Sequence, residues 1–125
     1  MPGHVREFRM PSLHTLEAQA EFAAFRDARG WAPFHDPRSL ALALCAEAGE
    51  LAGVLSWQSD DGGLSDDVHA AAAAELGDVI AFALHLANAL EIDLGAEVAR
   101  SLETARQRFA SLPPGTPSRK GGTAP

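Results

Sequence analysis

The sequence predicts an all-α fold from three observations. Apolar residues recur with the 3.6-residue period of a helix along most of the chain, without a convincing run of strand alternation. Helix-capping residues stand before several of these periodic stretches. The 125 residues suit one domain. We therefore expect a bundle of four to five helices.

The first helix is expected over residues 16–29, where Gly30 ends it because glycine readily adopts the left-handed conformation that follows a helix. After a short linker, Asp36 is expected to cap a second helix. Pro37 then takes the first helical position, where its missing N–H costs nothing. Apolar periodicity carries this second helix to about Trp57.

The acidic, glycine-containing stretch 59–67 is expected to be a loop. Ser65 at its end can cap a third helix over residues 68–90, and the two aspartates after it suit the positive end of the helix dipole. Asp93 can cap a fourth helix that reaches about Phe109. The chain thus predicts two long central helices joined by an acidic loop.

The predicted domain organisation is an N-terminal extension over residues 1–14, a helical domain over 15–110 and a disordered C-terminal tail over 111–125. The N-terminal residues lack the apolar core of a signal peptide. A single cysteine, Cys45, excludes an internal disulfide, and we expect it to be a small buried side chain. These features predict a cytoplasmic protein.

The amino-acid composition limits the classes of ligand that the chain is expected to bind. The net charge is −7, with 22% charged and 46% hydrophobic residues, which is typical of a soluble globular protein. Binding to nucleic-acid polymers depends on lysine and arginine neutralising phosphates, so the acidic balance argues against it. A small anionic ligand would need a cation to help it bind.

The third helix has an unusual pattern. From residue 70 to residue 90 its only polar side chains are Glu75, Asp78, His85 and Asn88, which fall within an arc of about 140°. The remaining faces are apolar and need cover, so we expect a homo-oligomer. A membrane span is the alternative, but each mid-helix acid would oppose insertion by about 2.5–3.5 kcal/mol. For His85 and Asn88 we expect hydrogen bonds at an interface rather than catalysis.

Two pairs of acidic residues are the candidate metal ligands. Glu47 and Glu50 lie one turn apart on the second helix, and Glu75 and Asp78 repeat this spacing on the third. If the two helices pack antiparallel, the four carboxylates can converge and would need divalent cations to offset their repulsion. Mg²⁺ suits such oxygen ligands, with Mn²⁺ as the alternative, and it commonly bridges carboxylates to a nucleoside triphosphate. One such pair alone is usually a solvated helix face.

The order FRDARGW, FHDPRSLALALCAEAGEL, W, AAELGDVIAFALHLA, IDL resembles the MazG-like, all-α nucleoside triphosphate pyrophosphohydrolases, and most closely their dCTP pyrophosphatase branch. The resemblance covers residues 25–109, and its E-x-x-E and E-x-x-D signature is intact. It implies a subunit that forms a dimer or a dimer of dimers. It also implies Mg²⁺-dependent hydrolysis of a (d)NTP to the monophosphate and pyrophosphate, cleaning the nucleotide pool, with pyrimidine deoxynucleotides as leading substrates.

The resemblance also assigns expected roles. All four acids would hold the metal, and Glu47 or Glu50 would orient or deprotonate the attacking water. Trp31 and Trp57 resemble an aromatic pair near the base, and indole can stack on a base. His35 would contact sugar or phosphate, although it could instead hydrogen-bond its own turn.

The sequence departs from this branch in its last helix. Ser101 and Ala105 replace a lysine and an asparagine that help to bind phosphate or sugar, and Phe82 replaces a tyrosine after the acid pair. Three arginines could supply the missing positive charge, although solvated surface arginine is the usual interpretation. These are Arg100, Arg106 and Arg108. The alternative function is a catalytically degenerate helical dimer that binds nucleotide or metal as a sensor or assembly partner.

Overall fold

The structure is a computed structural model that describes residues 15–58 and 63–117. Within these ranges the chain forms four α-helices, one short 3₁₀ helix and no strand, which confirms the all-α prediction. The chain divides into two compact units, the first ending at Leu94 and the second beginning at Gly95. We describe each unit by itself.

Helix α1 covers Thr15–Ala28, and a glycine-dependent turn ends it. The backbone N–H of Trp31 donates to the carbonyl of Arg26 at 3.0 Å, and the N–H of Gly30 donates to the carbonyl of Asp27 at 3.1 Å. Gly30 has a φ of 68°, the left-handed conformation that this termination motif requires. The motif confirms the predicted role of Gly30 and fixes where the chain leaves the helix.

Two predicted caps are present on the central helices. Helix α2 covers Pro37–Leu55, and the backbone N–H of Ser39 donates to Oδ1 of Asp36 at 2.9 Å. Helix α3 covers Asp66–Ala89, and the N–H of Val68 donates to Oγ of Ser65 at 3.2 Å. A 3₁₀ helix, Ala32–Phe34, occupies the linker before α2.

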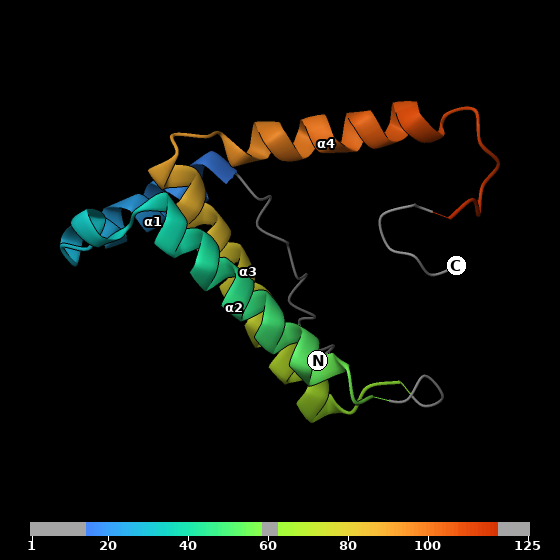
Figure 1. Ribbon diagram of the computed structural model, residues 1–125, viewed down its shortest axis with the longest axis horizontal. Helices are drawn as coiled ribbons and strands as arrows, with labels where there is room; N and C mark the ends of the chain where they lie inside the picture. The colour runs from blue at the N-terminus through green and yellow to red at the C-terminus, as the bar shows by residue number, and fades with distance from the viewer. Residues whose placement is uncertain (1–14, 59–62, 118–125) are drawn as a thin grey trace, which may run out of the picture. The chain divides into compact units, whose positions relative to one another are not determined.

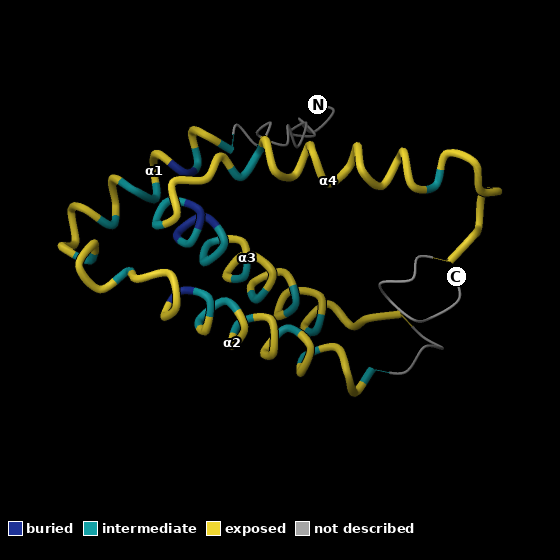
Figure 2. The backbone as a smooth tube through the Cα atoms, turned by 45° about the horizontal axis from the view of Figure 1, so that its top comes forward, coloured by how far each residue is buried: buried dark blue, intermediate teal, exposed yellow. Residues whose placement is uncertain are grey.

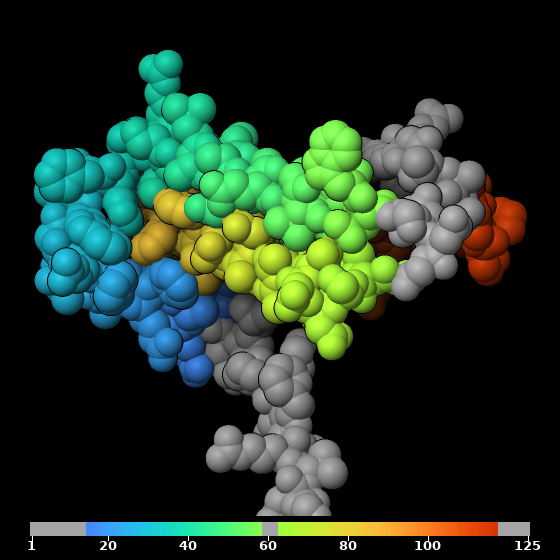
Figure 3. Space-filling model, turned by 90° about the horizontal axis from the view of Figure 1, so that it is seen from below, coloured from blue at the N-terminus to red at the C-terminus, as the bar shows by residue number. Residues whose placement is uncertain are grey.

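Helices α2 and α3 run antiparallel, side by side along most of their length (Figure 1). In the space-filling view the green residues of α2 lie directly against the yellow residues of α3 (Figure 3). Helix α1 packs against α3, and the buried residues gather on α1, at the start of α2 and on the C-terminal half of α3 (Figure 2). They are Gln19, Leu40, Leu84, His85 and Ala87.

A hydrogen-bond network around Gln19 joins α1 to the end of α3. The Gln19 side chain donates to the carbonyl of Ile92 at 2.7 Å and to Oδ1 of Asn88 at 3.2 Å. Its Oε1 accepts from the N–H of Leu94 at 3.0 Å, and Asn88 Nδ2 donates to the Gln19 carbonyl at 2.9 Å. Asn88 therefore makes hydrogen bonds between α3 and α1 within the chain.

Helix α4 covers Leu94–Phe109 and begins directly after Asp93 as predicted, and all of it after Leu94 belongs to the second unit. Its charged side chains pair along its own surface, as Arg100 Nε lies 2.7 Å from Glu97 Oε2. Val98 and Leu102 on its apolar stripe are exposed. Residues 111–117 form turns, and the rest of the predicted tail, together with residues 1–14, lies outside the described residues.

Cys45 is exposed, so the expectation that it is buried was wrong. It lies about 200° around α2 from Glu47, on the face turned away from α3. Among the described residues, helix α3 is long and apolar enough to cross a membrane by length and composition alone. This is weak evidence, because core helices of soluble proteins also meet these criteria.

Candidate metal and nucleotide site

The antiparallel packing of α2 and α3 brings acids from both helices together. Glu47 on α2 and Glu75 and Asp78 on α3 each offer a carboxylate oxygen, and these three oxygens lie within 4.8 Å of one another. Glu50 is close enough to raise the pKa of both Glu47 and Glu75. The structure thus brings together the four acids that the sequence singled out. Below we call these residues the acid cluster.

The acid cluster perturbs the titration of Glu47 and Glu75. Partial burial, the charges of Glu50 and Asp78, and a close approach to Glu50 and Glu75 together raise the pKa of Glu47 to about 7. Burial and the neighbouring acids raise the pKa of Glu75 as well. Like charges held together favour the neutral form of a carboxyl group. A proton or a cation must therefore be shared in this cluster near neutral pH.

The acid cluster fits a divalent cation. Glu47 Oε2 and Glu75 Oε2 are buried and have no hydrogen-bond partner among the described residues. Native proteins leave few buried polar atoms unpaired, and each unpaired atom calls for a ligand, water or ion. An all-carboxylate donor set suits hard cations such as Mg²⁺ or Mn²⁺ better than softer metals.

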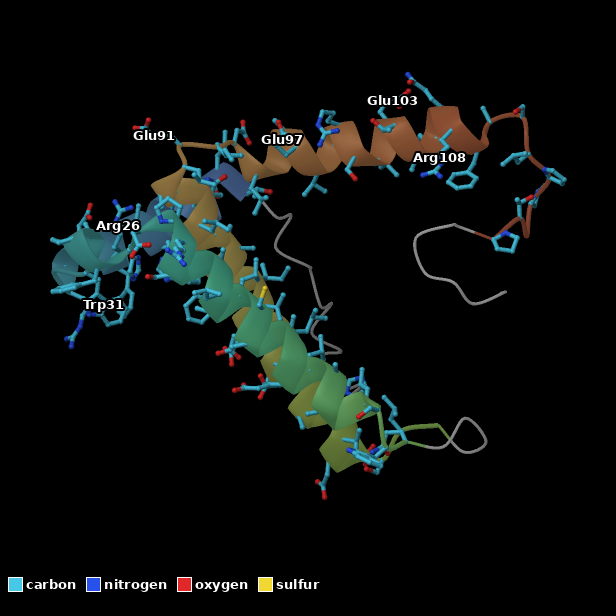
Figure 4. The ribbon with its side chains drawn as sticks, in the orientation of Figure 1. Arg26, Trp31, Glu91, Glu97, Glu103 and Arg108 are labelled. Carbon is cyan, nitrogen blue, oxygen red and sulfur yellow. The ribbon has the colours of Figure 1, made fainter. Side chains whose placement is uncertain are left out.

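A second feature is an open pocket of about 570 Å³, which we call the aromatic pocket. The turn after α1, the 3₁₀ helix, the turn before α2 and the C-terminal half of α3 supply its walls. Trp31, labelled in Figure 4, follows the turn after α1 and is one of the lining residues, and the Arg29 guanidinium lies 5.8 Å from its ring centroid. The complete lining is Trp31, Phe34, His35, Phe82 and His85.

Ring contacts hold the walls of this pocket together. The His35 and His85 rings meet edge to face with centroids 4.7 Å apart. Phe22 packs edge to face on His85 at 5.1 Å, and Phe25 packs in the same way on Trp31 at 5.3 Å. Edge-to-face packing is favourable for aromatic rings, so the lining residues support one another.

The acid cluster and the aromatic pocket share one face of α3. Glu75, Asp78, Phe82 and His85 fall within an arc of about 80°, and His85 lies about 10 Å along the axis from Asp78. A phosphate held at the acids and a planar ring held in the pocket would therefore belong to one extended ligand. This arrangement suits a nucleotide.

The remaining predicted site residues are Trp57, Arg106 and Arg108. Trp57, just after α2, is 89% exposed and does not line the aromatic pocket. Arg106 and Arg108 belong to α4 in the second unit. Arg106 Nη1 lies 3.9 Å from Glu103 Oε2, and the Arg108 guanidinium lies 5.5 Å from the Phe109 ring centroid. Their roles in substrate binding remain predictions.

Sequence reasoning missed two lining residues. Phe34 was treated only as part of a linker, and His85 was assigned to an interface. The spacing of His85 at seven residues after Asp78 places both on the same face of a helix, and this signal could have identified it. Phe34 could not be found in this way because the 3₁₀ helix that presents it lies outside the long periodic stretches.

Comparisons with known proteins bear on this site. No protein-family model matches the chain. It is 40% identical to mouse dCTP pyrophosphatase 1 over 112 residues, which are 83% of this chain and 64% of the mouse protein. It is 36% identical to human dCTP pyrophosphatase 1 over 124 residues, which are 95% of this chain and 71% of the human protein.

The chain spans less than two thirds of the mouse and rat relatives, covering 64% and 59% of their lengths. A solved pyrophosphatase from Archaeoglobus fulgidus has a similar fold, with a TM-score of 0.63 and 28% identity over 77% of this chain and 92% of that one. Since the human relative is matched over most of both chains, the chain belongs to the dCTP pyrophosphatase family, with an all-α fold of the MazG-like type.

Proposed function

We propose that the chain hydrolyses deoxynucleoside triphosphates to the monophosphate and pyrophosphate, with a preference for dCTP or a modified pyrimidine nucleotide. The observation that carries this proposal is the convergence of acids from α2 and α3 in a chain of this family. The names of the curated relatives support both the reaction and the base preference.

In this proposal the acid cluster holds Mg²⁺, with Mn²⁺ as a substitute. The bound ion would neutralise phosphate charge and polarise a water molecule. The four carboxylates position it, and Glu47 or Glu50 accepts the proton of the water that attacks the α-phosphorus. A carboxylate beside the attacking water can accept this proton, and Glu47 is the α2 acid with an oxygen within 4.8 Å of carboxylate oxygens on α3.

The aromatic pocket takes the base, which lies against Trp31 near His35. Trp57, Arg106 and Arg108 complete the proposed substrate contacts, the first by stacking and the arginines by binding the phosphates of the leaving pyrophosphate. The contribution of each of these three residues needs a separate test by substitution.

We further propose that the chain works as a homo-oligomer, either a dimer or a dimer of dimers, in the cytoplasm. Helix α3 exposes large apolar side chains, with Leu76 at 52% and Ile80 at 45% exposure. Burying such side chains against a second copy would remove apolar surface from water. The net charge of −7 also supports a small nucleotide rather than a nucleic-acid polymer as partner.

The test is a panel of common, oxidised and methylated dNTPs incubated with Mg²⁺, followed by chromatography of monophosphate and pyrophosphate. We expect turnover of pyrimidine deoxynucleotides. Glu50→Gln and Asp78→Asn should reduce it at least about 100-fold without loss of helical content. Asp67→Asn is a matched control, because Asp67 is an exposed acid at the other end of the same helix.

Three outcomes would change the proposal. Retained activity in Glu50→Gln or Asp78→Asn removes that residue from the site. Absence of turnover across the panel, with nucleotide still bound, favours the sensor or assembly role. Absence of both turnover and binding contradicts a nucleotide-related function altogether.

A further inference from the structure

The aromatic pocket contains a buried polar group that the proposed reaction does not use. His85 is only 8% exposed, and its Nδ1 has no hydrogen-bond partner among the described residues. The neighbouring His35 has the same unpartnered Nδ1. Since proteins rarely leave buried polar atoms unpaired, two such atoms in the wall of one pocket indicate a ligand with polar groups of its own.

The other walls of the pocket offer little hydrogen bonding. Phe34 and Phe82 have no polar side-chain atom, so the polar groups of the lining are the indole N–H of Trp31 and the two imidazoles. Apolar rings favour a planar ligand ring, whereas the imidazoles can bond to the edge of that ring. The chemistry of the lining therefore matches a flat, heteroaromatic ligand.

The charge state of His85 also suits an uncharged ligand edge. Burial lowers the pKa of His85, and the nearby charges of His35 and Arg26 lower it further. The imidazole is then neutral at neutral pH, with one nitrogen that donates and one that accepts. A neutral imidazole can pair with either a donor or an acceptor on the edge of a base.

We propose that His85 is a specificity-determining residue, which hydrogen-bonds the polar edge of a pyrimidine in the aromatic pocket and so selects against an apolar ring of the same shape. This inference rests on the proposed function. It is carried by the position of His85 on the same face of α3 as Glu75 and Asp78, by its burial and by its unpartnered nitrogen.

The first experiment compares dCTP with the triphosphate of a difluorotoluene deoxynucleoside, an apolar ring of pyrimidine shape. His85→Phe keeps an aromatic ring in place but removes both nitrogens. We expect about a tenfold loss of kcat/KM for dCTP, mainly through KM, and a change of less than about twofold for the apolar analogue. His85→Asn, which restores a donor and an acceptor, should recover part of the selectivity.

Phe22→Leu is the matched control. Phe22 packs on the His85 ring at 5.1 Å but does not line the aromatic pocket, so this change loosens the packing without removing a polar group. Phe22→Leu should change kcat/KM by the same factor for dCTP and for the apolar analogue. The proposal is overturned if His85→Phe also lowers kcat/KM equally for both substrates, or if it leaves the selectivity for dCTP over the apolar analogue unchanged.

A second measurement separates this inference from the proposed reaction. Titration of dCMP into protein labelled with ¹⁵N-histidine follows the ring nitrogens of His85 without requiring hydrolysis. We expect the His85 resonances to shift on binding, and the dCMP affinity to fall about tenfold in His85→Phe. The proposal is overturned if dCMP binds without shifting the His85 resonances, or if dCMP does not bind. If dCMP binds and shifts His85 while no triphosphate is hydrolysed, only the proposed reaction fails.

Discussion

Glu47 and Glu75 sit on different helices, yet their carboxylate oxygens come within 4.8 Å of each other, and each has a buried Oε2 without a hydrogen-bond partner in the described part of the chain. Two anions so placed oppose the packing of α2 on α3 unless a proton or cation lies between them. This relationship links the stability of the helix pair to the chemistry of the site.

The acid cluster should make the metal-free protein less stable as the pH rises. Glu47 has a pKa of about 7 in the folded chain against an ordinary value of 4.5. Between these values the unfolded chain releases a proton that the folded chain keeps, so stability falls as pH increases across the window. We expect the Tm measured in chelator to decrease from about pH 5 to about pH 7.

Glu47→Gln should flatten this dependence, because the amide has no proton to lose. Glu103→Gln is the control, since Glu103 is an exposed acid on α4. Its Tm profile should follow the unmodified chain. If Glu47→Gln retains the full fall in Tm, another group is responsible and the assignment to Glu47 is wrong.

Divalent cations should reverse this destabilisation. A cation that binds only the folded chain stabilises it by about 2.7 kcal/mol at a concentration 100 times its Kd. We expect Mg²⁺ to raise the Tm, and to do so more strongly at higher pH because binding displaces the Glu47 proton. Asp78→Asn should lose most of the shift, and Asp67→Asn should keep it. Equal shifts in both variants would place the bound ion outside the acid cluster.

The sequence predicted the acid cluster well because helical geometry alone fixes most of it. The E-x-x-E and E-x-x-D spacings put each pair on one face, and a short loop forces neighbouring helices to run antiparallel. The caps at Asp36 and Ser65 were predictable for a similar reason, since capping depends on residues three positions apart.

The aromatic pocket was less predictable because it depends on contacts between distant segments. The 4.7 Å approach of His35 to His85 joins residues fifty positions apart, and no local pattern encodes it. The four hydrogen bonds that connect Gln19 with Asn88, Ile92 and Leu94 are equally non-local. Sequence periodicity identifies the face of a helix, but the partner of that face depends on the packing of the whole subunit.

The ends of α1 and α3 offer a direct comparison of glycine with a non-glycine residue in the same turn. In α3 the N–H of Ile92 donates to the carbonyl of Ala87 at 2.9 Å, as Trp31 does to Arg26 in α1, but Glu91 occupies the glycine position with a φ of 55°. A side chain in this conformation is strained. Glu91→Gly should therefore stabilise the chain by about 0.5–1 kcal/mol in urea unfolding followed by circular dichroism.

Glu91→Ala separates backbone strain from charge, because it removes the carboxylate but keeps the β-carbon. We expect no comparable gain from it. Gly30→Ala should lower the free energy of unfolding by about 1 kcal/mol, because it places a β-carbon in the same left-handed conformation. Equal stabilisation by Glu91→Gly and Glu91→Ala would show that charge, rather than backbone conformation, limits stability at this turn.

The side chain of Gln19 joins α1 to the end of α3. Gln19→Ala leaves the Ile92 carbonyl, the Leu94 N–H and Asn88 Oδ1 without this partner. Leaving buried polar groups unpaired costs about 1–3 kcal/mol, so the variant should unfold at clearly lower urea concentration.

Gln58→Ala is the control, because Gln58, which follows α2, makes a single 3.4 Å side-chain bond to the carbonyl of Val54 near the end of that helix. Loss of this hydrogen bond should change the free energy of unfolding by no more than about 0.5 kcal/mol. Equal effects of the two variants would show that the network around Gln19 does not stabilise the contact between α1 and α3. A larger effect at Gln19 would confirm that this contact, which also places Phe22 against His85, depends on one buried amide.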